Sequence, residues 1–322
     1  MIPTNRAVWD KSASKAMRRA IFFSAILVLT FTLVSRAAAQ TPGKFAANTV
    51  TLGLIAEMNP KEVEQHFQEF MGYLAEKLSP GAKIESRVIA VPSQARLAGL
   101  LTEKKADFYL ESPHPTYLIN SVYGAGKLLL RRWKGGMADY HTLIFTRRGG
   151  EIRRLEDLQG KMIAFEDPES TSGHFLPRMF LTRKGFKLAP KPQIEAKVAR
   201  GEIGYIFAQT QEKLVDLVLA GEAAAGAFSN DDYTALREPK KSEIAILAET
   251  ASLPRHLVSV RKTLPAASTH RLRAVLLSMH EDPEGRRILK DIDGTTKFDT
   301  LPGGELAISQ RLLDTFYSPG KK

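Results

Sequence analysis

The 322-residue sequence contains no cysteine. This excludes disulfides, a thiolate metal site, a cysteine nucleophile and a lipid attached to cysteine. Also missing are the Gly-x-Ser-x-Gly elbow of hydrolases, the His-Glu-x-x-His zinc motif and the Gly-x-x-x-x-Gly-Lys-Ser/Thr phosphate loop. The seven histidines are dispersed, without metal-ligand spacing. We therefore predict no cofactor, no metal and no enzymatic activity.

Long apolar runs are also scarce, and the one clear run lies near the N-terminus. It covers residues 21–34 and is followed by Ala37-Ala38-Ala39 and Gln40. A basic segment precedes it, with Arg6, Lys11, Lys15, Arg18 and Arg19. This order is typical of a secretory signal peptide, so we predict cleavage after Ala39 and a periplasmic location. An uncleaved anchor is the alternative, although the run is shorter than the roughly 20 apolar residues of a membrane span.

Acidic residues are fewer than basic ones, with 35 Asp and Glu against 46 Lys and Arg, a net charge of +11. Part of the excess lies in the predicted signal peptide. The basic pairs are Arg131-Arg132, Arg147-Arg148, Arg153-Arg154, Lys240-Lys241 and Arg286-Arg287. Because they are scattered, they indicate solvated surface charge and not a nucleic-acid site. A moderate positive charge suits a protein that captures anions.

Segments typical of strands alternate with segments typical of helices after residue 48. The pattern predicts strands at 50–55, 84–91, 107–110, 140–147, 162–165, 223–228 and 244–247. Helices are predicted at 60–78, 92–101, 151–158, 212–219, 268–279, 283–290 and 304–317. This alternation predicts an α/β fold with mostly parallel sheets flanked by helices. We expect two lobes, 48–143 plus 255–322 and 144–254, with chain crossings near 143–146 and 254–260.

One stretch combines a strand, a hydroxyl-rich loop and a helix start. The apolar run 162–165 is followed by Ser170-Thr171-Ser172-Gly173, and Pro177 places a helix start near Gly173 or His174. Free N–H groups, the helix dipole and three hydroxyls would then face one point, which favours an anion. The alternative is that a hydroxyl only caps the helix, which is the ordinary role of Ser and Thr there.

The same stretch, Asp167-Pro-x-Ser-Thr-Ser-Gly173 with Pro177, resembles the signature of the PhnD-like phosphate-, phosphite- and phosphonate-binding proteins of ABC importers. Three further segments resemble that family in the same order, at 155–165, 105–117 and 282–286. The resemblance implies a type 2 periplasmic binding fold with the ligand between the lobes. It also implies that Ser170, Thr171 and Ser172 bind a small oxyanion together with the loop around Gly173.

The resemblance further assigns Ser112, Tyr117 and Tyr140 to the ligand site or its wall. His114 is an additional donor by position, or simply a turn residue between two prolines. The family pattern is broken at Gln94, at Thr210-Gln211-Glu212 and at Ala224, where members carry other ligand-recognising residues. The anion cage is retained while the rest of the ligand site has changed.

The function implied is an extracytoplasmic solute-binding protein that captures phosphonate, phosphite or phosphate for an ABC permease. The expected partners are that small oxyanion and the permease, with no nucleic acid, and the expected state is a monomer. Two alternatives remain at this point: a module that presents the ligand to a membrane-bound sensor kinase, and a secreted hydrolase that uses Ser170 or Ser172 with His174 and Asp167.

Overall fold

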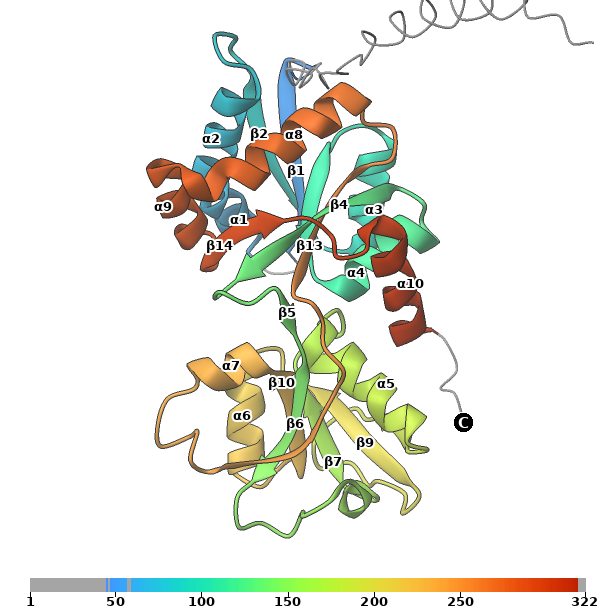
Figure 1. Ribbon diagram of the computed structural model, residues 1–322. Helices are drawn as coiled ribbons and strands as arrows, with labels where there is room; N and C mark the ends of the chain where they lie inside the picture. The colour runs from blue at the N-terminus through green and yellow to red at the C-terminus, as the bar shows by residue number, and fades with distance from the viewer. Residues whose placement is uncertain (1–44, 46, 57–58, 318–322) are drawn as a thin grey trace, which may run out of the picture. The chain divides into compact units, whose positions relative to one another are not determined.

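The computed structural model of the protein describes residues 45, 47–56 and 59–317 (Figure 1). The predicted signal peptide and its cleavage site lie outside the described residues. All described residues fall within one compact unit. None of the helices in this part of the chain is long and apolar enough to cross a membrane.

The first of two six-stranded sheets combines strands from both ends of the chain. Its order is β14 (Thr295–Asp299), β4 (Gly126–Lys134), β13 (His256–Arg261), β3 (Phe108–Glu111), β1 (Thr49–Ile55) and β2 (Glu85–Val91). Strand β1 pairs in parallel with β2 and β3, whereas β13, β4 and β14 pair antiparallel. The sheet is therefore mixed and not mostly parallel, because β13 returns from the other half of the molecule and inserts beside β3.

Helices cover the first sheet on both faces. On one face lie α1 (Pro60–His66), α2 (Gln68–Leu78), α8 (Ala266–Ser278) and α9 (Pro283–Asp291). Apolar residues of α2 recur at helical spacing, and Phe70, Met71 and Leu74 are fully buried against the sheet, as the sequence predicts. On the other face, α3 (Gln94–Thr102) buries Leu97 and Leu101 against Tyr109. The short helix α4 (Pro113–Tyr117) follows β3 directly.

The second sheet has the order β11 (Ile244–Glu249), β6 (Thr142–Arg147), β10 (Ala225–Ser229), β7 (Met162–Phe165), β9 (Glu202–Phe207) and β8 (Lys187–Pro190). Parallel pairs join β10 to β7, β7 to β9, and β9 to β8. Strand β6 pairs antiparallel with β10 and β11. Helix α6 (Gln211–Leu219) covers one face, α5 (Leu176–Arg183) the other, and α7 (Asn230–Ala235) follows β10.

A two-stranded ribbon joins the two sheets. Strand β5 (Asp139–Tyr140) leads into the second sheet, and β12 (Leu253–Pro254) pairs with it on the way back. Figure 1 shows this ribbon between the two sheets. Residues 143–146, where the first crossing is predicted, lie inside β6 and pair with β10 and β11. Pro254, near the predicted return, pairs with Asp139 of β5.

A second apolar connection lies beside the ribbon. Helix α10 (Gly304–Phe316) belongs to the C-terminal part of the chain, yet it packs near α5 of the other half. We call the buried set that joins them the bridging cluster: Leu128, Tyr140, Leu176, Leu253, Leu257, Ile308, Leu312 and Phe316. The two sheets are thus connected by shared hydrophobic packing as well as by two chain crossings.

Candidate functional site

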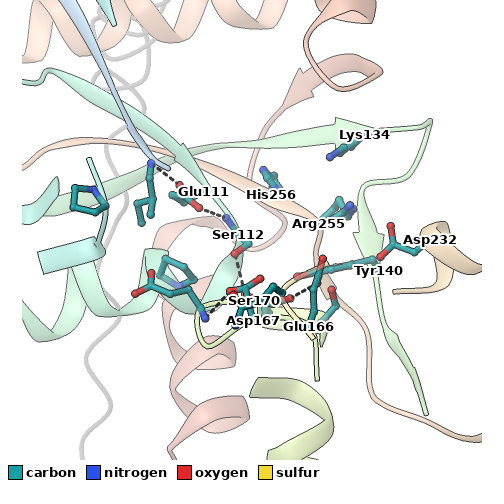
Figure 2. A pocket seen from close by; sticks show the side chains of 17 residues that line it. Glu111, Ser112, Lys134, Tyr140, Glu166, Asp167, Ser170, Asp232, Arg255 and His256 are labelled. Atoms are coloured by element: carbon teal, nitrogen blue, oxygen red, sulfur yellow. Dashed lines mark hydrogen bonds between the residues drawn. The ribbon is translucent and has the colours of Figure 1, made fainter. Parts of the chain in front are cut away.

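A cavity of about 580 Å³ opens between the two sheets (Figure 2). It is lined by Ile55, Pro92, Glu111, Ser112, Pro115, Lys134, Tyr140, Glu166, Asp167, Glu169, Ser170, Thr171, Ser172, Gln209, Asp232, Arg255 and His256. Several of these lie at the carboxyl ends of parallel strands: Ile55 is the last residue of β1, Glu111 is the last residue of β3, and Glu166 directly follows β7. In open α/β sheets, ligands bind outside the carboxyl ends of the strands.

The helix that follows β7 begins at Thr171, two to three residues before the predicted start. Ser170 is its N-cap, and a single π turn over Thr171–Phe175 leads into α5, with Pro177 near its first position. Gly173 packs against Glu166, and a Cβ atom there would come within 2.6 Å of the Glu166 Cβ. Glycine is therefore required at 173 so that Glu166 can approach the helix start.

The three hydroxyls have different roles. The Ser170 Oγ accepts from the Gly173 N–H and donates to Glu166 Oε2, both at 2.9 Å, so the capping interpretation holds for this residue. The Thr171 Oγ1 links the two halves, because it donates to Ser112 Oγ at 3.0 Å and accepts from the His114 N–H at 3.1 Å. The Ser172 side chain lines the cavity.

Backbone donors are available at the same place. Within residues 45, 47–56 and 59–317, the N–H groups of Thr171 and Ser172 form no hydrogen bond. The first N–H groups of a helix have no partner inside it, and the helix dipole makes this end attractive for negative charge. The helix start therefore offers uncharged donors to an anion in the cavity.

Two predicted ligand residues lie away from the cavity. Tyr117 stacks on Tyr317, with ring centroids 4.8 Å apart. The His114 side chain is 3% exposed, stacks on Phe175 and places Nε2 3.3 Å from the Tyr317 hydroxyl. Burial lowers the pKa of His114 to about 3, so its ring is neutral. The family resemblance suggests Tyr117 for the site, and position suggests His114, but α10 lies beside α4 and covers both rings.

Tyr140 lines the cavity as predicted, and a residue from the returning crossing lies on it. The Arg255 guanidinium carbon is 4.6 Å from the centroid of the Tyr140 ring, and Arg255 Nη2 is 2.7 Å from Asp231 Oδ2. Arg255 is 8% exposed. Sequence reasoning missed it, although its place directly after Pro254 at the crossing could have indicated it. This fixed cation adds an electrostatic partner for an anion.

The cavity lining contains more carboxylates than cations. The acidic residues are Glu111, Glu166, Asp167, Glu169 and Asp232, and the basic ones are Lys134 and Arg255. Burial raises the pKa of Glu111 to about 7, and burial also raises the pKa of Glu166. No group of three or more His, Asp or Glu side chains in the described chain is arranged to hold a metal ion. A ligand that carries only negative charge would be repelled by these carboxylates, so the excess of carboxylates restricts which ligands the cavity can bind.

Glu111 should make stability depend on pH. Burial raises the pKa of Glu111 to about 7 in the folded protein, against an ordinary glutamate pKa of 4.5, so the folded state binds more protons between these values and stability falls as pH rises through them. Glu111→Gln removes this penalty. We expect its free energy of unfolding to exceed that of wild type by about 1–3 kcal/mol at pH 8, with the difference lost near pH 4.

Urea unfolding at both pH values measures this, and Glu76→Gln on the exposed face of α2 is the matched control. A constant difference between Glu111→Gln and wild type at pH 4 and pH 8 would contradict the assignment. It would show that Glu111 ionises as freely in the folded state as in the unfolded chain.

The two sheets, the joining ribbon and the cavity between them define a two-lobed periplasmic binding protein. A family model described as the periplasmic substrate-binding protein of phosphonate ABC transporters matches residues 52–301. The chain belongs to this family, as the Ser-Thr-Ser-Gly motif predicts. The family is one of solute-binding proteins, and it implies a small-molecule ligand and an ABC permease.

Solved structures show the same fold. A Xanthomonas citri protein is 26% identical, and its structure with chloride has a TM-score of 0.78 and covers 84% of this chain and 98% of its own. The same protein has also been solved with ATP, at a TM-score of 0.76. PhnD1 of Prochlorococcus marinus with methylphosphonate is 15% identical, with a TM-score of 0.60 over 83% of this chain and 97% of its own.

Proposed function

We propose that this protein captures a small phosphorus oxyanion that carries a cationic substituent, and that it delivers this ligand to an ABC permease. The observation behind the proposal is the hydroxyl-rich helix start at Ser170–Ser172, which faces a cavity shared by both lobes. Family membership supports the phosphorus oxyanion and the permease.

The oxyanion would bind at the helix start. Its oxygens would accept from the Thr171 and Ser172 N–H groups and from the Ser172 hydroxyl, because the Ser170 and Thr171 hydroxyls already donate to Glu166 and Ser112. Arg255 would compensate its charge from the other side. In Figure 2, Lys134, His256 and Arg255 lie across the cavity from Ser170 and Glu166. Burial lowers the pKa of Lys134, although Asp293 Oδ2 lies 3.9 Å from its Nζ.

The cationic substituent follows from the five carboxylates. A bare phosphate or phosphite would bring negative charge close to Asp167, Glu169 and Asp232, and it would favour the protonated forms of Glu111 and Glu166, whose pKa values burial already raises. An ammonium group on the ligand would convert these carboxylates from repelling groups into partners. The volume also fits, since about 580 Å³ holds roughly 20 water molecules, far more than a tetrahedral anion needs.

A matched pair of ligands tests this proposal. Isothermal titration calorimetry on residues 40–322 would compare 2-aminoethylphosphonate with ethylphosphonate, which differ only in the ammonium group. We expect the amine-bearing ligand to bind about tenfold or more tightly, with phosphate, phosphite, sulfate and ATP weaker. Equal affinity for the pair would refute the cationic substituent, and a protein that binds no phosphorus compound in the panel would refute the function.

We also propose a monomeric receptor without catalytic activity, exported by a signal peptide that is cleaved after Ala39. The serine, histidine and aspartate of the hydrolase alternative do not form a triad. The His174 Nδ1 bonds to the Pro168 carbonyl at 2.9 Å, and Nε2 is buried without a hydrogen bond among the described residues. Ser170 bonds to Glu166 instead. N-terminal sequencing of secreted protein and size-exclusion chromatography test the remaining points.

A further inference from the structure

Beyond the helix start, the cavity contains one donor whose state is set by a buried arginine. His256 is the first residue of β13 and lies directly opposite Arg132 of β4 in the antiparallel ladder. The Arg132 Nη1 is 3.3 Å from the His256 Nδ1. An arginine can only donate hydrogen bonds, so Nδ1 must be the acceptor. The proton of the neutral imidazole therefore lies on Nε2.

Arg132 cannot readily move away from this position. It is 1% exposed, and its other nitrogens are also engaged. Nε donates to Thr295 Oγ1 at 2.7 Å, and Nη2 donates to the Ile292 carbonyl at 2.8 Å and to Asp293 Oδ2 at 3.1 Å. A guanidinium fixed on three sides presents its remaining nitrogen to His256 in one geometry. The tautomer of His256 is thus determined by the fold and not by the ligand.

The other ring nitrogen of His256 is not engaged by the part of the chain that the structure describes. His256 lines the cavity and is half-buried, and within the described chain its Nε2 forms no hydrogen bond and is not enclosed. Figure 2 shows His256 between Glu111 and Arg255. Burial, followed by the positive charges of Arg132, Arg255 and Lys134, holds the pKa of His256 well below its usual range. The ring offers a neutral N–H and not a charge.

We propose that His256 is a specificity-determining residue whose Nε2–H donates to an acceptor atom of the ligand, with Arg132 as the residue that positions it. A neutral donor favours an oxygen over an ammonium at this point of the cavity. It would therefore orient a zwitterionic ligand, with an oxygen toward β13 and the cationic group toward the carboxylates. This inference rests on the proposed function.

The first arm of the test needs no ligand. A long-range ¹H–¹⁵N correlation spectrum of ¹⁵N-histidine-labelled protein at pH 7 reports which ring nitrogen of His256 carries the proton. We expect Nε2–H as the single tautomer in wild type and a mixture in Arg132→Lys, whose shorter and differently shaped head cannot reproduce the contact. A His256 protonated at Nδ1, or an unchanged spectrum in Arg132→Lys, would overturn the role of Arg132.

The second arm measures affinity for 2-aminoethylphosphonate and methylphosphonate by calorimetry. His256→Phe keeps a ring without a donor, and we expect a roughly tenfold to hundredfold weaker affinity for the better-bound probe. His256→Gln restores an N–H near the Nε2 position and should stay within about threefold of wild type. His270→Phe, at an exposed position of α8, is the matched control and should bind like wild type.

The outcomes separate the two claims. If wild type binds a probe and His256→Phe binds it equally well, the inference about His256 is wrong while the proposed function stands. If His256→Gln is as weak as His256→Phe although both fold, as judged by circular dichroism, donation from Nε2 is also refuted. If wild type binds neither probe, the proposed function fails, and this inference fails with it.

Discussion

Protein that carries Ser170→Ala together with Thr171→Val is expected to bind 2-aminoethylphosphonate roughly a hundredfold or more weakly than wild type. The two changes remove two of the three hydroxyls at the start of the helix after β7: the Ser170 cap and the Thr171 hydroxyl that links the lobes. Thr171 is 2% exposed, and its Oγ1 contacts Ser112 and the His114 N–H across the cavity. Calorimetric titration of folded, purified variants measures the loss.

The control for this experiment lies on the same helix. Thr182→Val makes the same chemical change as Thr171→Val at an exposed position, where the hydroxyl donates to the Arg178 carbonyl at 2.8 Å. It should leave affinity unchanged. If the double variant bound as tightly as wild type, the hydroxyls would serve only helix capping and lobe contact, and the anion would have to bind elsewhere in the cavity.

The bounds of a helix or strand can be predicted from the sequence where neighbouring residues determine them. Strand β7 has the predicted bounds, and α6 begins within one residue of its predicted start, because a threonine cap precedes a clear apolar face. The helix at the site was predicted too late. Sequence alone did not show that the Ser170 hydroxyl reaches the Gly173 N–H and lets the helix begin at Thr171.

The cavity itself could be predicted only in part, since most of its charged residues come from distant segments. Ser112, Tyr140 and the Ser170–Ser172 loop lie where the motif suggests. Glu111 ends β3, whereas Arg255 and His256 lie together at the start of β13, and nothing in the local sequence of either segment brings them to one cavity. The ligand contacts of the predicted residues and the positions of the lobe boundaries stay predictions.

The strand order and direction in the two sheets could also be predicted only in part. Strands β4, β9 and β14 were not predicted, and without the antiparallel strands β4 and β14 the first sheet seems mostly parallel. Strand β4 alternates buried and partly buried residues from Gly126 to Lys134, but its run of Lys and Arg conceals this. One of these basic residues, Arg132, is fully buried and holds His256. The basic composition of β4 therefore does not show which of its Lys and Arg side chains are buried and which are exposed.

The bridging cluster carries the second large effect that we expect, this time on stability. Leu312 of α10 is 1% exposed and lies in the cluster that contains Leu176 of α5 and Leu253 of β12. Leu312→Ala removes buried methyl groups and leaves a cavity where the two lobes meet. We expect the free energy of unfolding to fall by about 2–5 kcal/mol, measured by urea denaturation.

The next residue along α10 provides the matched control, because a helix turns by about 100° per residue and directs neighbours to different faces. Leu313 is 36% exposed, and Leu313→Ala should cost less than about 1 kcal/mol. The large loss at Leu312 should come without loss of the ligand contacts at Thr171, so calorimetry of the folded variant should give near wild-type affinity. Equal destabilisation by both variants would show that α10 is not held by the buried face that joins it to α5, and the packing connection between the lobes would then have to be reassigned to the β5–β12 ribbon alone.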